Sequence, residues 1–136
     1  MRDSVPPRTL RIVAPTAGPV AARESADYII GLAKRIGAEV IALHIRSRQE
    51  ATGEAAAGPN VFVDAGLDAG VTVITAVRSE NVVDAIIETA TLAQAAMIVM
   101  GASGGSVVDD WLSSDVMGRC DVPVVVIPHV VAGCGN

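Results

Sequence analysis

The chain has 136 residues, a length typical of a single domain. Hydrophobic residues make up 51% of it and aromatic residues only 2%, so any core must be built from Val, Ile, Leu and Ala. Its net charge of −5 argues against binding to nucleic acids or anionic membrane surfaces, because both depend on clustered Lys and Arg.

Strand and helix patterns alternate along the chain between a flexible lead-in at 1–8 and a patternless tail at 129–136. Apolar runs predict strands, and apolar residues at three- and four-residue steps predict helices. Residues 60–69 are expected to be helical, although two Val and a Phe also suit a strand. The predicted strands are 9–15, 38–45, 70–77, 96–100 and 122–128, and the predicted helices are 20–37, 60–69, 81–95 and 109–119. Residues 9–128 are therefore interpreted as one domain.

This alternation predicts an α/β fold, an open five-stranded parallel sheet with helices on both faces. Asn81 is expected to cap the helix at 81–95. In such sheets a ligand lies beyond the carboxyl ends of the strands, where the strand order reverses. The loops at 15–19 and 101–106 are expected to meet there.

Other features point to a soluble, non-catalytic protein. No apolar run approaches the roughly 18 residues of a membrane span, and the polar start lacks the apolar core of a secretory signal. A cytoplasmic location is therefore expected. Cys120 and Cys134 are expected to be reduced thiols. His44 lies in an apolar strand, where a core role is favoured over catalysis, and no metal-ligand spacing is present.

A glycine-rich loop follows the strand at 96–100 and has the shape of a phosphate cradle. Glycine allows main-chain N–H groups to point inward, and a helix start follows. If the loop holds phosphate, the expected contacts are Gly101, Gly104, Gly105, Ser106, Ser113 and Ser114. The alternative, which the residues favour, is a glycine-rich turn that only joins the strand to the helix. The loop lacks countercharge, because Arg119 is the only basic residue between 97 and 128, against four Asp. A bound Mg²⁺ would offset that deficit.

The segments "RIVAPTAGPVAARESADYIIGLAKRIGAEVIALHI" and "AAMIVMGASGGSVVDDWLSSDVMGRCDVPVVVIP" resemble the opening and closing parts of the universal stress protein family. The resemblance covers nearly the whole chain. It implies an adenine nucleotide alpha-hydrolase-like fold with strand order 3-2-1-4-5 and a homodimer formed by the fifth strands. The implied interface residues are Val122, Val124, Val125, Val126 and Ile127. Pairing in a dimer would also cover an apolar edge strand.

Family members that bind ATP carry G-x2-G-x9-G-[ST] after the fourth strand. Gly101 and Gly104 fill the first two positions, but Ser114 and Asp115 stand at the last two. Ala17 stands where the ATP binders have an Asp that contacts the nucleoside. The resemblance therefore implies a nucleotide crevice with changed contacts, to which Pro15, Thr16, Ala17 and His44 would also contribute.

Three functions follow from these observations. The first is a dimeric, cytoplasmic regulatory or binding module in a stress response, with no catalysis required. The second is a member that binds ATP or AMP, with Mg²⁺, as a nucleotide-dependent switch or slow ATPase. The third is a regulatory domain that partners a membrane transporter.

Overall fold

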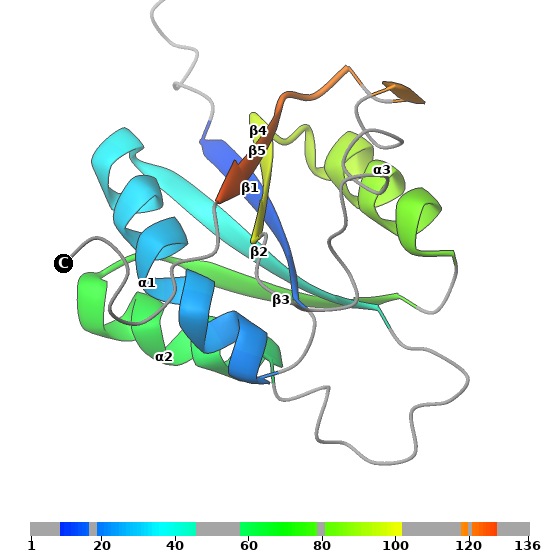
Figure 1. Ribbon diagram of the computed structural model, residues 1–136. Coiled ribbons are helices and arrows are strands. Elements are labelled where there is room, and N and C mark those ends of the chain that lie inside the picture. Colours follow the sequence, from blue (N-terminus) through cyan, green and yellow to red (C-terminus); the bar gives the residue numbers. More distant parts are fainter. Residues whose placement is uncertain are drawn as a thin grey trace, which may run out of the picture.

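The computed structural model describes residues 9–16, 19–45, 58–78, 81–101, 118–119 and 121–127. The strands are β1 (Leu10–Thr16), β2 (Ala38–Ile45), β3 (Val73–Arg78), β4 (Met97–Gly101) and β5 (Val124–Ile127), and the helices are α1 (Pro19–Ile36), α2 (Gly58–Ala69) and α3 (Val82–Ala93). All strand pairs are parallel, and the order is β3-β2-β1-β4-β5, as predicted (Figure 1).

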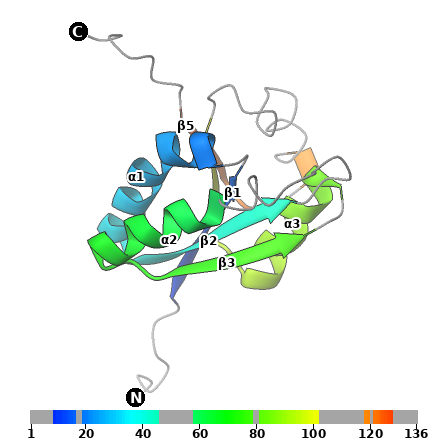
Figure 2. The ribbon, with the colours of Figure 1, turned by 90° about the horizontal axis from the view of Figure 1, so that it is seen from below.

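Helices α1 and α2 cover one face of the sheet and α3 covers the other (Figures 1 and 2). The central strands β1 and β2 are therefore buried on both sides, which explains their nearly continuous apolar sequences. The α1/α2 face is centred on Ile12, Val40, Phe62 and Val99. The α3 face is built from Val13, Ile41, Leu43, Val83, Ile86, Ala90, Ile98 and Met100.

Residues 58–69 form helix α2, so the helical interpretation of this region is confirmed. The helix ends in a turn in which Gly70 has a φ of +76° and the Val71 N–H donates to the Gly66 carbonyl at 2.8 Å. A Cβ on Gly66 would lie 2.5 Å from Val73 Cγ2 and 2.7 Å from the Val71 oxygen. Glycine at this position therefore allows α2 to approach β3 closely.

Both ends of α3 are capped. The Asn81 side chain accepts hydrogen bonds from the N–H groups of Val83 and Asp84, which confirms the predicted N-cap. At the other end, Gln94 adopts a left-handed conformation with a φ of 52°. The Arg11 side chain donates to the Ala93 carbonyl at 3.1 Å, so a cation from β1 lies at the negative end of the helix dipole.

The starts of β3 and β5 differ from the sequence prediction by two or three residues, and those of β1 and β4 differ by one. Strand β3 begins at Val73 instead of 70, because the turn that closes α2 uses Gly70 and its neighbours. Strand β5 begins at Val124 instead of 122, and residue 128 lies outside the described residues. Among the residues expected in the helix at 109–119, Gly118 and Arg119 are seen to be helical, and the others lie outside the described residues.

The lead-in at 1–8, the tail at 129–136, Cys120, Cys134 and Trp111 also lie outside the described residues. No helix in the part of the chain that the structure describes is long and apolar enough to cross a membrane.

Candidate ligand site at the carboxyl edge of the sheet

The carboxyl ends of the strands form one row across the sheet. Thr16 is in register with His44, and His44 is in register with Val77. On the other side of β1, Gly101 is in register with Ile127. Because side chains alternate along a strand, these positions share the α1/α2 face, as the buried Ile12, Val40 and Val99 do.

The strand order reverses between β1 and β4. The chain passes from β1 through α1 to β2 on one side, and from β3 through α3 to β4 on the other. Val13 pairs with Ile98, and each strand then continues for three residues, to Thr16 and Gly101 respectively. The two strands therefore end at the same level. The position between them is a topological switch point, and α/β sheets bind ligands at such points.

Pro15 interrupts the pairing of β1 with β4 just before this point. The Arg11 carbonyl accepts a hydrogen bond from the Ala96 N–H at 2.8 Å, so alternate residues of β1 turn their main-chain groups toward β4. The next ladder bond after the Val13–Ile98 pair would run from the Pro15 nitrogen to the Val99 carbonyl. Proline has no N–H to donate, so this ladder bond is missing near the carboxyl ends of β1 and β4.

Thr16 and His44 are buried polar residues within an otherwise apolar region. The Thr16 hydroxyl donates to the Leu43 carbonyl at 3.2 Å, which fixes the side chain across the β1–β2 pair. An imidazole and a fixed hydroxyl oxygen beside the switch point can recognise a polar ligand through hydrogen bonds. His44 is thus a buried strand residue, as expected, and it also lies at the carboxyl edge.

The structure brings together Pro15, Thr16, His44 and Gly101, four of the residues expected to line the crevice. The predicted contacts Ala17, Gly104, Gly105, Ser106, Ser113 and Ser114 lie outside the described residues. The interruption by Pro15 was missed in the sequence, although a proline in a central strand of a parallel sheet is a recognisable signal.

Two basic residues of the described ranges that lie toward this edge have acidic partners. Arg119 Nη2 lies 2.7 Å from Asp84 Oδ1, and this ion pair joins the segment before β5 to the first turn of α3. Arg78, at the end of β3, forms an ion pair with Glu88. These pairs reduce the positive charge available to a phosphate group at the carboxyl edge.

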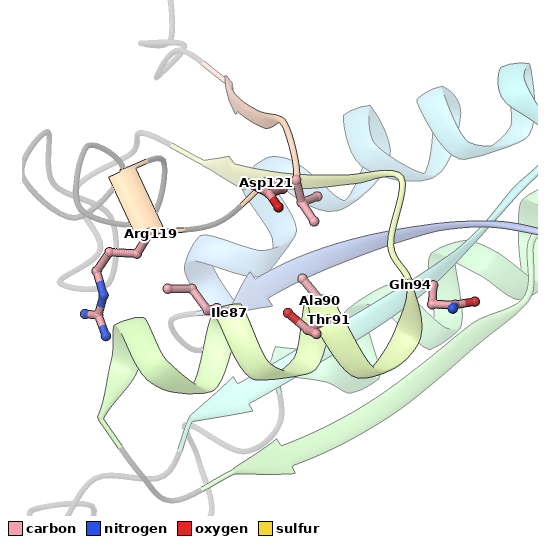
Figure 3. A pocket seen from close by; sticks show the side chains of 7 residues that line it. Ile87, Ala90, Thr91, Gln94, Arg119 and Asp121 are labelled. Carbon is pink, nitrogen blue, oxygen red and sulfur yellow. The ribbon is translucent and has the colours of Figure 1, made fainter.

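A separate groove of about 320 Å³ lies between α3 and the segment at 119–122 (Figure 3). Its lining residues are Ile87, Ala90, Thr91, Gln94, Arg119, Asp121 and Val122. None of the residues expected to contact a nucleotide lines it. Within the described ranges, no group of three or more His, Cys, Asp or Glu residues could hold a metal ion.

The residues expected at a dimer interface differ in their exposure. Val125 and Val126 are exposed on β5, which is an edge strand of the sheet. Ile127 is buried in the α1/α2 core, and Val122 and Val124 pack against the α3 core. Only the middle of the strand therefore offers apolar side chains to a partner.

Open parallel α/β sheets form a class of domains that bind ligands beyond the carboxyl ends of their strands, at a topological switch point. The profile of the universal stress protein family matches residues 9–128, and the chain belongs to this family. No curated protein sequence gives a significant match.

Solved structures agree with this fold. A universal stress protein in complex with cAMP is similar with a TM-score of 0.72 at 19% identity, over 91% of this chain and 100% of that chain. The Archaeoglobus fulgidus universal stress protein in complex with dAMP has a TM-score of 0.69 at 22% identity, over 88% of this chain and 98% of that chain. UspA from Lactobacillus plantarum has a TM-score of 0.69 at 19% identity, over 90% and 99%.

Proposed function

We propose that this universal stress protein is a non-catalytic regulatory module that binds an adenosine monophosphate, cyclic or open, in the crevice between β1 and β4. The main support for the proposal is that β1 and β4 end at the same level. Pro15 interrupts their pairing there, and Gly101 begins the glycine-rich loop. The buried Thr16 and His44 supply polar groups beside it. Two similar proteins hold cAMP and dAMP, which supports an adenine ligand.

The charge around the crevice favours a ligand with one phosphate over ATP. Arg119 is the only basic residue between 97 and 128 and is paired with Asp84, whereas four Asp occur in the same stretch. A triphosphate brings more negative charge into an environment that already repels it. The changed motif positions Ser114 and Asp115, and Ala17 on the facing loop, are consistent with a weaker triphosphate site.

Calorimetric titration with cAMP, AMP and ATP with Mg²⁺ tests the ligand. The monophosphates should bind more tightly than ATP, and at about 100 times Kd they should stabilise the fold by about 2.7 kcal/mol. Trp111, the sole tryptophan, provides a fluorescence readout. Tighter binding of ATP would contradict the charge argument, and no binding of any of the three would contradict the nucleotide proposal. Release of phosphate from ATP would show that the protein is an enzyme.

The proposal includes a homodimer in the cytoplasm, formed by pairing of the β5 strands. Support comes from the exposed Val125 and Val126 on an edge strand, because such an edge is an aggregation hazard unless it is covered. The presence of only two cysteines fits a reducing compartment. Light scattering at micromolar concentration tests the interface: Val126→Lys should form a smaller species than the wild type. A monomeric wild type, or equal sizes for the two proteins, would contradict it.

A further inference from the structure

Strand β3 forms the edge of the sheet opposite β5. In the described part of the chain only β2 pairs with it, so its outer side is open. The side chains of Ile74 and Val77 are 43% and 56% exposed. Edge strands are commonly protected by charged residues or prolines. Residues 73–77 contain neither, and Arg78 at the end is held by Glu88.

The open side of β3 presents a regular set of main-chain groups. The Thr72 carbonyl accepts a hydrogen bond from the Val40 N–H at 3.0 Å, so Thr72 and every second residue after it face β2. The N–H and C=O groups of Val73, Thr75 and Val77 therefore point away from the sheet. They can form hydrogen bonds with an added strand.

An apolar groove lies beside the start of this edge. Its volume is about 390 Å³, and Val63, Gly66, Leu67 and Val73 are among its lining residues. Leu67 is 76% exposed. Gly66, whose missing Cβ allows α2 to approach β3 closely, is one of the residues that line this groove.

We propose that the β3 edge binds a second copy of this chain, as an antiparallel strand pair with its two-fold axis at Thr75. In this register Thr75 faces Thr75 of the second copy, and Val73 faces its Val77. All of these residues have outward main-chain groups, and their side chains share the α2 face. Cross-strand pairs of β-branched residues are favourable.

The groove and the exposed valine favour a second copy over an unrelated partner. Val77 of the second copy lies opposite Val73, which lines the groove, so the exposed valine of one copy reaches the groove of the other. Two-fold symmetry repeats this contact, so each copy inserts its Val77 beside the groove of the other. Arg78 lies opposite Thr72, so no like charges face each other across the pair. This interface is independent of nucleotide binding. Because it lies on the edge opposite β5, a protein that pairs through both edges would form assemblies larger than a dimer.

Light scattering and sedimentation in a Val126→Lys background test this interface, because that change disrupts the proposed β5 pairing. The Val126→Lys protein should form dimers as its concentration rises through the micromolar range. Adding Val77→Lys or Leu67→Lys should raise the dimer dissociation constant about tenfold or more. The matched control is Leu92→Lys, because Leu92 is a similarly exposed leucine (72%) on α3 and its replacement should leave the dimer intact.

A Val126→Lys protein that stays monomeric at every concentration overturns the proposal. The proposal is also overturned if the Val77→Lys, Leu67→Lys and Leu92→Lys variants dimerise equally well. A strand from a different protein would then be the remaining candidate to bind the β3 edge. Circular dichroism of each variant verifies the fold. Leu67 is an exposed helix residue, so Leu67→Lys keeps the test decisive if Val77→Lys unfolds the protein.

Discussion

The two ends of the sheet use their polar groups in different ways. At the amino end, Arg11 contacts Glu39 and the carbonyl of Ala93, and its own carbonyl accepts a hydrogen bond from Ala96. At the carboxyl end, Thr16 and His44 are small buried groups beside the end of an interrupted ladder. The amino end is thus joined by contacts within the fold, whereas the carboxyl end carries the buried polar groups of the proposed ligand site.

This difference predicts that substitutions at the two ends have separable effects. Changes at the amino end should lower the free energy of unfolding and leave ligand affinity unchanged. Changes at the proposed site at the carboxyl end should weaken ligand binding and leave the free energy of unfolding nearly unchanged. Substitutions of Gly66, Arg11 and Pro15 test that separation, and Asn81→Ala tests a helix cap that lies at the carboxyl end but outside the proposed site. They follow in order of the expected effect on stability.

Gly66→Ala should cause the largest loss of stability. The added Cβ would lie within 3 Å of Val73 Cγ2 and the Val71 carbonyl, so α2 or β3 must shift. Overpacking of this kind lowers the free energy of unfolding by about 1–3 kcal/mol. The control is Gly31→Ala, which meets no atom within 4 Å and should be neutral or stabilising. Chemical denaturation measures both, and equal effects would contradict the close approach of α2.

Asn81→Ala should have an intermediate effect, because it removes the side chain that accepts from the first N–H groups of α3. We expect a loss of about 1 kcal/mol in the free energy of unfolding. Asn81→Asp keeps the acceptor and should retain the stability of the wild type. An Asp variant as unstable as the Ala variant would contradict the capping role.

Arg11→Gln should have a smaller effect, because a solvent-accessible cation at a helix carboxyl end contributes only about 0.3–1 kcal/mol. The loss should shrink at high salt, since screening weakens the interaction. Arg23→Gln removes the same charge from an exposed position of α1 and serves as the control. A loss that is independent of salt would indicate that packing of the Arg11 side chain matters more than its charge.

Pro15→Ala should leave stability nearly unchanged while it weakens ligand binding. The alanine N–H can donate to Val99 and extend the β1–β4 ladder, which stabilises by about 1 kcal/mol. Loss of the proline costs a similar amount, because the unfolded chain becomes more flexible. Titration with AMP, alongside denaturation, measures both quantities. Unchanged affinity would contradict the role of Pro15 in opening the crevice.

Most of the fold could be predicted from the sequence, because strand and helix patterns differ clearly in period and several ends carry specific signals. Asn81 is such a signal, and it caps α3 as expected. The start of β3 was less predictable, because Val71 is as apolar as Val73 and the turn at Gly70 depends on the packing of α2. The ion pair between Arg119 and Asp84 was not foreseen, because it joins residues 35 positions apart.

The candidate site could be predicted only in part. The strand ends that carry Thr16 and Gly101 follow from the alternating pattern and from the resemblance to a family. The interruption at Pro15 required the register of β1 and β4, which a sequence pattern does not contain. The excess of Asp over Arg between 97 and 128 can be counted in the sequence, whereas the ion pair between Arg119 and Asp84 required the structure.

The central claim is that the crevice between β1 and β4 binds an adenosine monophosphate. Calorimetric titration of AMP into the wild type, Gly101→Val and Gly31→Ala tests it most directly. A branched side chain at the end of β4 should block the crevice, so Gly101→Val should lose binding while the wild type and the α1 control bind equally. Binding by Gly101→Val with the affinity of the wild type would contradict the claim.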